Sequence, residues 1–413
     1  MKFINFTIFI SCISVIALAL WSYIGVTRHK AMKFILGLVI SGISMAILVS
    51  YGILFPDLKG SPWLAPFHGA ALASLSWVFT LFWTLPFLLF GAIGCAIYRW
   101  QKRKKNDSTP SIPDDGGDKT MSRRAFLKGA AVAIPTAALA TSAVGNVVGE
   151  EYLATTTHDL YYPDLPDYLD GYRIGQLSDT HMGLFFSPEN LQESLDAAAA
   201  QHVNRLELTG DLIDELSRLP EYQEILRKNA DRFPDGIEFC YGNHEYYRGL
   251  PEITVMLEKT PVRILRNNNF CASPGEGRNL KDRKGRDKRP FYIAATDYSF
   301  AKGDEAFQAE REDFVKQALD GIPKDAFVVL LAHHSAFIDE AFAHHIPLTL
   351  CGHTHGGQVA LIGPIVETVG FKYLRGMYRH GHSYGYVNRG TGHWLPFRML
   401  CSREVSVFTL HKQ

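Results

Sequence analysis

The stretch GHTHGGQ, residues Gly352–Gln358, is the most informative part of this 413-residue chain. Its two histidines are one residue apart, so both side chains point to the same side of an extended segment. The neighbouring glycines let the backbone come close to whatever the histidines hold. By itself the stretch only suggests a metal-binding loop, and other ligand-type residues must fold beside it.

Four further clusters of metal-ligand residue types precede this loop. Each follows an apolar run that has the length of a β-strand. The clusters are Ser178–His181 (SDTH), Gly210–Asp214 (GDLID), Gly242–Glu245 (GNHE) and Ala332–His334 (AHH). The loops beyond the carboxyl ends of strands converge on one crevice in α/β sheets, so we expect all five clusters to share one site.

The sequence from about residue 151 to 413 predicts a soluble α/β domain. Ser187 and Pro188 suit the N-cap and the first position of a helix over 187–201. Short strands late in the chain indicate a second sheet. The strands that we expect are 172–178, 205–209, 236–241, 326–331, 347–351 and 405–410.

Charge divides the chain into two parts. The 42 basic and 42 acidic side chains cancel, which gives no support for a nucleic-acid partner, because domains that bind nucleic acid are usually strongly basic.

Three windows contain no charged residue: Ile4–Ile24, Phe34–Leu54 and Leu72–Tyr98. Each is about as long as the roughly 20 residues that a helix needs to cross a bilayer. Residues 1–100 are therefore predicted to be a membrane domain with three transmembrane helices.

Basic residues predict how these helices are oriented. The first connector carries Arg28, Lys30 and Lys33, and Arg99 with residues 102–105 follows the third window. The positive-inside rule places both segments in the cytoplasm and the N-terminus outside. We therefore expect a multi-pass protein of the cell inner membrane.

Residues 101–120 are polar and rich in turn-forming residues, and we interpret them as a linker. Ser122–Lys128 (SRRAFLK) and an uncharged stretch of small residues follow, within 121–150. This segment resembles a twin-arginine export signal, which would make the export machinery a partner. The alternative is a fourth membrane helix or an amphipathic surface segment. A signal or a fourth crossing places the C-terminal domain in the periplasm or another extracytoplasmic compartment.

The side chains of the five clusters suit two divalent metal ions. They offer carboxylate, amide and imidazole ligands from Asp179, His181, Asp211, Asn243, His333, His353 and His355. Two ions roughly 3.5–4 Å apart can clamp a phosphoryl centre. The six cysteines form no CxxC pair, so a thiolate site is not expected. Oxygen and imidazole ligands suit Mn, Fe, Zn, Co or Ni.

In order, spacing and strand context the clusters resemble the motifs of the calcineurin-like metallophosphoesterases, over roughly Tyr172–Leu410. The tail Tyr386–Gly392 (YVNRGTG), with Pro396 and Arg398, resembles their bacterial membrane-associated branch, whose members act as phosphodiesterases or lipid-pyrophosphate hydrolases. The resemblance implies a four-layer α/β/β/α sandwich, here preceded by N-terminal transmembrane helices, with two metals at one edge.

The resemblance also implies a role for each residue. The first ion would be held by Asp179, His181, Asp211 and His355. The second ion would be held by Asp211, Asn243, His333 and His353. His244 would be the catalytic histidine that donates a proton to the leaving group, and a hydroxide that bridges the metals would attack phosphorus in line.

Five residues near the motifs keep two interpretations each. Asp214 stabilises its loop or binds metal, and Glu245 orients the Asn243–His244 turn or a ligand histidine. Arg389 meets a substrate phosphate or forms a structural ion pair. His334 competes with His333 as a ligand, and His393 faces the site or lies apart from it.

Two segments bear on the substrate. Leu184–Phe186 (LFF) forms an apolar lip beside the site or packs into the core at the helix start. The basic insert 278–289 is a solvated hairpin tip or contacts anionic lipid headgroups. With the membrane segments, these features favour a phosphoester or pyrophosphate bond in an envelope phospholipid, a lipid-linked phosphate or a precursor. The alternatives are a hydrolase of small soluble nucleotides or phosphodiesters in the periplasm and a non-catalytic metal-binding docking module.

Overall fold

The computed structural model describes residues 12, 15–20, 30–58, 61–106, 137, 140, 142, 144–145, 152–272, 289–358, 371–393, 398 and 401–413. The chain divides into two compact units, Met1–Val148 and Gly149–Gln413. Most of the first predicted membrane window, most of the polar linker, the arginine pair and nearly all of the basic insert lie outside the described residues.

The N-terminal unit contains two long helices, α2 (Lys30–Leu58) and α3 (Leu64–Asn106). Within them, Phe34–Phe55 and Leu64–Gly94 are long and apolar enough to cross a membrane. Polar side chains on the two helices bond to each other: the Trp77 indole donates to the Ser41 hydroxyl over 3.0 Å, and Tyr51 pairs with His68 over 2.8 Å. Such bonds satisfy polar groups that lipid cannot, so the pair is consistent with transmembrane helices.

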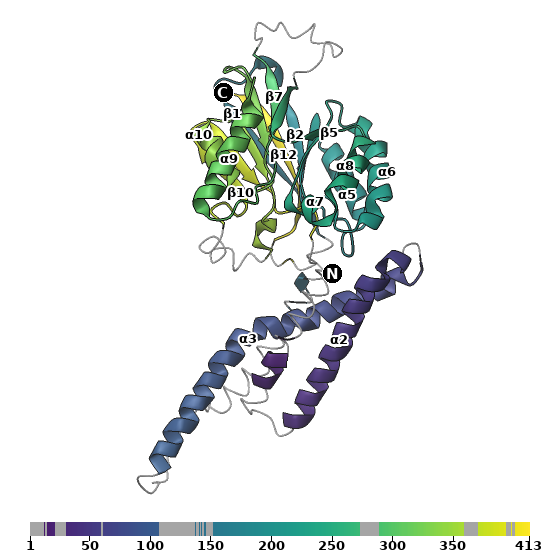
Figure 1. The fold of residues 1–413 in the computed structure, drawn as a ribbon, viewed down its shortest axis with the longest axis vertical. Helices are drawn as coiled ribbons and strands as arrows, with labels where there is room; N and C mark the ends of the chain where they lie inside the picture. The colour runs from purple at the N-terminus through teal and green to yellow at the C-terminus, as the bar shows by residue number, and fades with distance from the viewer. Residues whose placement is uncertain are drawn as a thin grey trace. The chain divides into compact units, whose positions relative to one another are not determined.

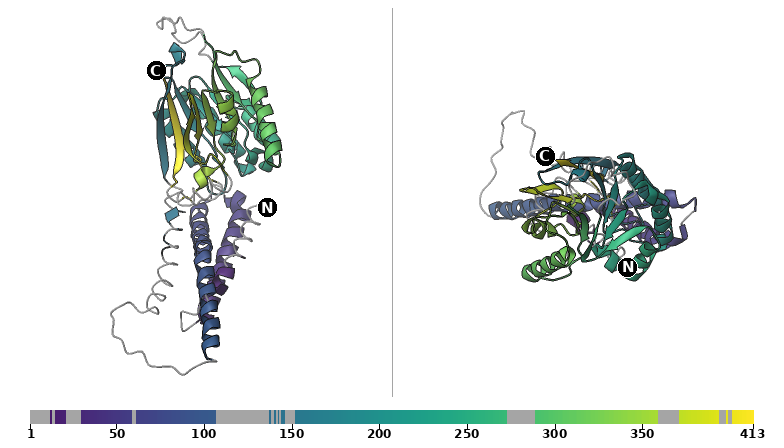
Figure 2. Two further views of the ribbon diagram at one scale, coloured as in Figure 1. Left: turned by 90° about the vertical axis from the view of Figure 1, so that its left-hand side faces the viewer. Right: turned by 90° about the horizontal axis from the view of Figure 1, so that it is seen from above.

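The C-terminal unit is built on two six-stranded sheets (Figures 1 and 2). The first sheet contains, in spatial order, β1 (Leu153–Tyr162), β12 (Arg403–Lys412), β2 (Arg173–Leu177), β3 (Arg205–Thr209), β4 (Ile237–Cys240) and β5 (Val262–Leu265). The second contains β10 (Gly376–His380), β11 (Ser383–Val387), β9 (Leu348–Cys351), β8 (Phe327–Leu331), β7 (Phe291–Ala295) and β6 (Asn268–Cys271). Strands β2 to β5 are mutually parallel, as are β7 to β9.

Helices cover both outer faces of the paired sheets (Figure 1). Beside the first sheet lie α5 (Pro188–Ala200), α6 (Leu219–Asn229), α7 (Asn243–Arg248) and α8 (Leu250–Glu258); beside the second lie α9 (Asp304–Leu319) and α10 (Phe337–Ala343). One apolar core fills the space between the sheets, and another lies under each helical layer. The predicted four-layer α/β/β/α architecture is confirmed.

The start of α5 shows how the local sequence sets an element. The Ser187 hydroxyl accepts from the Asn190 backbone N–H, and the Asn190 side chain accepts in return from the Ser187 N–H. With Pro188 at the first helical position, the predicted helix start is confirmed. Just before it, Phe185 and Phe186 are 4% and 0% exposed, so for these two residues the apolar-lip interpretation is wrong.

Candidate metal centre

The five sequence clusters meet at one edge of the two sheets. Because β2, β3 and β4 are parallel, their carboxyl ends lie at the same edge, and the loops after β8 and β9 meet them there. The predicted residues follow these strand ends: Asp179 and His181 (β2), Asp211 (β3), Asn243 and His244 (β4), His333 (β8), His353 and His355 (β9). The structure thus brings together residues that are up to 176 positions apart in the sequence, since 355 − 179 = 176.

Among the described residues, three groups of side chains could each hold a metal ion, because the ligand-type atoms within each group all lie within 4.8 Å of one another. They are Asp179, His181 and His355; His181, Asp211 and His244; and Asp211, His333 and His353. Asp211 belongs to two of these groups, and its Oδ2 atom lies 3.7 Å from Nε2 of His181 and 3.2 Å from Nε2 of His333, which suits a carboxylate shared by two ions. Asn243 lies beside the third group, with its amide oxygen 3.0 Å from the Nδ1 atom of His353.

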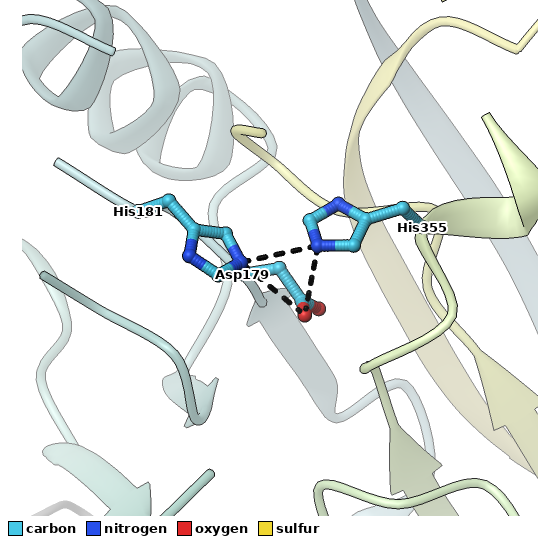
Figure 3. A group of neighbouring side chains, drawn as sticks. All are labelled: Asp179, His181 and His355. Carbon is cyan, nitrogen blue, oxygen red and sulfur yellow. Dashed lines mark hydrogen bonds and ion pairs between the residues drawn. The ribbon is translucent and has the colours of Figure 1, made fainter. Parts of the chain in front are cut away.

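In the first group the ring nitrogens converge on one carboxylate (Figure 3). The Nε2 atoms of His181 and His355 are 3.1 Å apart, and they lie 3.9 and 3.5 Å from the same oxygen of Asp179. Atoms that can each present a lone pair come this close when a cation or a proton lies between them. The arrangement could therefore hold a metal ion.

His333 shows how well the residues fit a metal. Its Nδ1 atom donates to the carbonyl oxygen of Thr209 over 2.6 Å, which fixes the tautomer and leaves the Nε2 lone pair pointing inward. The Nε2 atom is buried without a hydrogen-bond partner among the described residues, 3.2 Å from an oxygen of Asp211. Burial lowers the pKa of His333, but the Asp211 and Asp179 carboxylates outweigh it and raise the pKa to about 10. The two buried carboxylates thus favour positive charge beside them, which a divalent ion would supply.

The backbone is strained at these ligands. Nine non-glycine residues of the described segments have a positive φ angle. Five of the nine are candidate ligands: Asp179, His181, Asp211, His353 and His355, with φ between 47° and 73°. Such conformations are unfavourable for residues with a side chain and persist where the surrounding structure enforces them. Here the positive φ angles direct the side chains of these candidate ligands toward the same site.

Glycine is required where the ligand loops touch. A Cβ atom added at Gly352 would lie 1.9 Å from the Ser178 hydroxyl and 2.3 Å from an oxygen of Asp179. This close approach lets the His353 backbone N–H donate to the Asp179 carboxylate over 3.1 Å. The glycine before the first histidine of GHTHGGQ therefore joins that loop to the first cluster.

Glu245 holds two of the ligand loops together. Its carboxylate accepts hydrogen bonds from the backbone N–H groups of Asp211, Leu212 and Gly242, over 2.7 to 2.9 Å. Burial and the charge of Asp211 raise its pKa. Glu245 thus orients the Asn243–His244 turn, as one of its two interpretations predicted, and fixes the Asp211 loop as well.

Asp214 orients two histidines of the site. One of its oxygens lies 2.6 Å from Nδ1 of His244, 3.3 Å from Nδ1 of His181 and 3.0 Å from Nε of Arg248. Burial favours its neutral form, but the two imidazoles hold its pKa well below the ordinary value. Asp214 therefore does more than stabilise its own loop, because its carboxylate bonds to a candidate ligand and to the candidate catalytic histidine.

The structure also bears on the three remaining residues with two interpretations, which are His334, Arg389 and His393. His333 is a member of a ligand group, whereas His334 belongs to none and packs its ring 4.7 Å from that of His353. Arg389 forms an ion pair with Glu404 over 3.1 Å, in agreement with a structural role. His393 is buried and belongs to none of the three groups.

Two residues of the site received no role from the sequence. The Ser178 hydroxyl donates to the Asp179 carboxylate over 2.5 Å. The buried Arg398 guanidinium donates to the carbonyl oxygens of Gly390 and Gly392 and lies 3.4 Å from Nδ1 of His355. Ser178 directly precedes the motif aspartate Asp179 in the sequence, and this position could have indicated a supporting role. Arg398 lies 43 residues after its histidine, so spacing gave no signal.

The sequence profile of the calcineurin-like phosphoesterases matches residues 172–357. The metallophosphoesterase YkuE of Bacillus subtilis (strain 168) is 31% identical over 306 residues, which cover 71% of this chain and 98% of that protein. The chain belongs to the calcineurin-like phosphoesterase family. It is therefore a metallophosphoesterase, an enzyme that hydrolyses phosphoester bonds with divalent metal.

Two further similarities differ in extent. A transmembrane protein with metallophosphoesterase domain from Danio rerio is 27% identical over 258 residues, which cover 60% of this chain and 54% of that protein. This metallophosphoesterase thus spans about half the length of the zebrafish relative. Among solved structures, the calcineurin-like phosphoesterase YfkN from Bacillus subtilis matches with a TM-score of 0.29 and 17% identity, over 45% of this chain and 72% of that chain.

Proposed function

We propose that the site holds two divalent ions and hydrolyses a phosphoester or pyrophosphate bond in an envelope lipid or lipid precursor. Asp179, His181, Asp211 and His355 hold one ion, and Asp211, Asn243, His333 and His353 hold the other. The observation that carries this assignment is that one oxygen of Asp211 lies 3.7 Å from Nε2 of His181 and 3.2 Å from Nε2 of His333, which are proposed ligands of different ions. Bound divalent ions polarise phosphoryl oxygens and lower the pKa of the attacking water.

His244 is the proton donor to the leaving group in this proposal. Its backbone N–H donates to Asp211 over 2.7 Å, which keeps the residue beside the ligands. Its Nδ1 atom bonds to Asp214, so the opposite nitrogen, Nε2, is the one available to a leaving-group oxygen. The side chain is 16% exposed, which is enough for contact with a substrate at the rim.

Support for a lipid substrate comes from the N-terminal unit. Two apolar helices of membrane-spanning length precede the enzyme domain, and the zebrafish relative is named as a transmembrane protein. A membrane enzyme meets lipid-linked phosphates at high local concentration. Soluble nucleotides or phosphodiesters in the periplasm are the second candidate substrate class. A purely docking role is disfavoured, because the set of ligand-type residues is complete and the proton donor is present.

The proposed location is the inner membrane, with the enzyme domain on the extracytoplasmic side. Protease treatment of spheroplasts is the test, with a cytoplasmic protein as the control. We expect the enzyme domain to be digested while the control stays intact. An enzyme domain that stays protected until the membrane is lysed would place it in the cytoplasm instead.

The proposed reaction is tested with the purified full chain and Mn²⁺. We expect turnover of bis(4-nitrophenyl) phosphate. His244→Ala should lose about 10²-fold, the usual contribution of general acid–base catalysis, and Asp211→Ala, which removes a proposed ligand of both ions, should lose at least as much. Glu224→Ala, on the exposed face of α6, is the matched control and should keep wild-type turnover. Unchanged rates in both site variants would refute the assignment. Mass spectrometry of envelope lipids, with Asp211→Ala as the control, then identifies the lipid that is cut.

A further inference from the structure

Two exposed aromatic side chains lie next to the proposed proton donor. Tyr247 and Phe300 are 48% and 44% exposed, and their ring centroids are 5.9 Å apart. The ring of Tyr247 lies 5.8 Å from that of His244. Large apolar side chains are usually buried, so a contiguous exposed pair at the rim of an active site indicates a binding surface.

The pair continues into a strip of rings that reaches the other side of the metal centre. Phe300 packs on Tyr298 with centroids 4.8 Å apart, and the Tyr298 ring lies 5.6 Å from that of His353. The four rings of Tyr247, Phe300, Tyr298 and Tyr246 are the aromatic strip. It borders the site from the proton donor to a candidate ligand of the second ion.

A buried carboxylate anchors the strip. The Tyr246 hydroxyl donates to both oxygens of Asp297, at 2.6 and 2.7 Å, and its ring packs 5.2 Å from that of Phe300. Arg266 donates to the same carboxylate over 2.7 Å. The Tyr246 ring, on which Phe300 packs, is thus held in place before a ligand arrives, which reduces the entropy cost of binding.

We propose that the aromatic strip receives an acyl or alkyl chain carried by the leaving group of the substrate. This inference rests on the proposed function, because it takes His244 as the donor to the leaving-group oxygen. The atoms beyond that oxygen then extend past His244, where Tyr247 and Phe300 offer apolar surface. Lys302, two residues after Phe300 in the sequence, is also exposed.

The chemistry of the strip favours an alkyl chain over a nucleobase. A bound base needs polar partners for its edge, and two carboxylates in contact with residues of the strip or with His244, Asp297 and Asp214, already bond to protein groups. Both oxygens of Asp297 accept from Tyr246 or Arg266, and Asp214 serves two histidines and an arginine. An exposed aromatic surface next to a phosphoryl site suits an amphiphile, a phosphate group that carries hydrocarbon.

Calorimetric titration with hydrolysis-resistant phosphonates tests the proposal without requiring turnover. The metal-loaded full chain is titrated with methyl-, butyl- and hexylphosphonate, all below their aggregation concentrations. We expect hexylphosphonate to bind about tenfold or more tightly than methylphosphonate, because covering even two methylenes is worth about that factor. In Tyr247→Ala and Phe300→Ala this ratio should fall to about threefold or less, since part of the apolar surface is gone.

The control variant is Tyr161→Ala. Tyr161 is 49% exposed, like Tyr247, but it lies at the end of β1, and the antiparallel pairing of β12 with β2 puts that end at the sheet edge opposite the site. Its chain-length ratio should equal that of the wild type. Equal affinity for all three phosphonates in the wild type, or an unchanged ratio in both strip variants, would overturn the proposal.

Adenosine 5′-phosphonate distinguishes the competing ligand class. Tighter binding of this compound than of hexylphosphonate, lost in Phe300→Ala, would assign the strip to a nucleoside and also overturn the proposal. Hydrolysis of bis(4-nitrophenyl) phosphate is measured on the same preparations. Its absence in the wild type would refute the proposed function, whereas normal hydrolysis with no chain-length effect would refute the role of the strip alone.

Discussion

One oxygen atom of Asp214 connects three side chains that come from separate parts of the sequence. It lies within 3.3 Å of donors on His181, His244 and Arg248. A carboxylate can accept all three bonds because it carries no hydrogen of its own. Asp214 therefore sets the tautomer and direction of two imidazoles at once, and its removal should affect both metal binding and proton transfer.

Asp214→Asn tests this role. An amide keeps one acceptor oxygen but loses the negative charge, so its bonds to both histidines and the arginine are no longer charge-assisted. We expect turnover of the aryl phosphodiester to fall about 10–100-fold, the usual effect of losing such a supporting residue. Arg248→Gln, which removes the third donor and leaves both histidines bonded, should lose much less. The model of a shared orienting carboxylate is wrong if the two variants have equal activity.

At the scale of elements, β3 and β4 carry charged residues into the space between the sheets. Arg205 of β3 pairs with Glu238 of β4 over 2.5 Å. Glu207 of β3 is 0% exposed, and both its oxygens lack a hydrogen-bond partner among the described residues. Burial and the nearby Glu238 raise the pKa of Glu207 well above its ordinary value, and burial raises that of Glu238 to about 7 despite Arg205.

Because the pKa values of Glu207 and Glu238 are raised, we expect the free energy of unfolding to fall as pH rises. Both pKa values are higher in the folded than in the unfolded protein, so the contribution of the two carboxyls to stability is complete below about pH 4.5. The contribution of Glu238 is lost as pH rises through about 7, and that of Glu207 is lost as pH rises through its own raised pKa. Glu207→Met removes one buried ionisable group of similar volume. We expect it to raise the free energy of unfolding at pH 8 by about 1–3 kcal/mol and to weaken the pH dependence.

Denaturant melts at pH 5, 6.5 and 8 measure this effect. Glu224→Met replaces a glutamate that is exposed on α6 and should change neither the stability nor its pH dependence. A Glu207→Met protein that is less stable than the wild type at every pH would show that the carboxyl makes a favourable buried interaction.

The sequence predicted those elements and ligands that carry their own local signal. Strands such as β3 end at a ligand cluster, and the start of α5 follows from Ser187 and Pro188. Strand β1 (LATTTHDLYY) escaped notice because it lies at a sheet edge, where alternate residues are exposed and the apolar content is low.

Contacts between distant loops could not be predicted in this way. Tyr247 and Phe300 are 53 residues apart, and only the fold puts their rings together. Conversely, Phe185 and Phe186 adjoin the first metal motif in the sequence yet pack into the core. Proximity to a motif along the chain therefore did not show which apolar residues face the site.

At the scale of the whole molecule, folding and metal binding are linked in the C-terminal unit. Five candidate ligands have strained backbone conformations, and the Asp179 and Asp211 carboxylates are fully buried within reach of the same imidazoles. Burial and the charge of Asp211 raise the pKa of Asp179 even though the histidines lower it. Without cations this centre stores unfavourable electrostatic and conformational energy, which bound ions offset.

Metal removal is therefore expected to destabilise the enzyme domain. A ligand present at 100 times its Kd stabilises the folded state by about 2.7 kcal/mol, and a unit of this size shifts by about 2–4 °C for each kcal/mol. We expect chelation by EDTA to lower the Tm by about 5–10 °C, and Mn²⁺ to restore it. Asp211→Asn, which weakens both proposed ion sites, should respond less to each treatment. If metal analysis shows the chelated protein to be free of metal while its Tm is unchanged, the strained loops must be held by protein contacts such as those of Glu245 alone, and the ions would then serve only the chemistry.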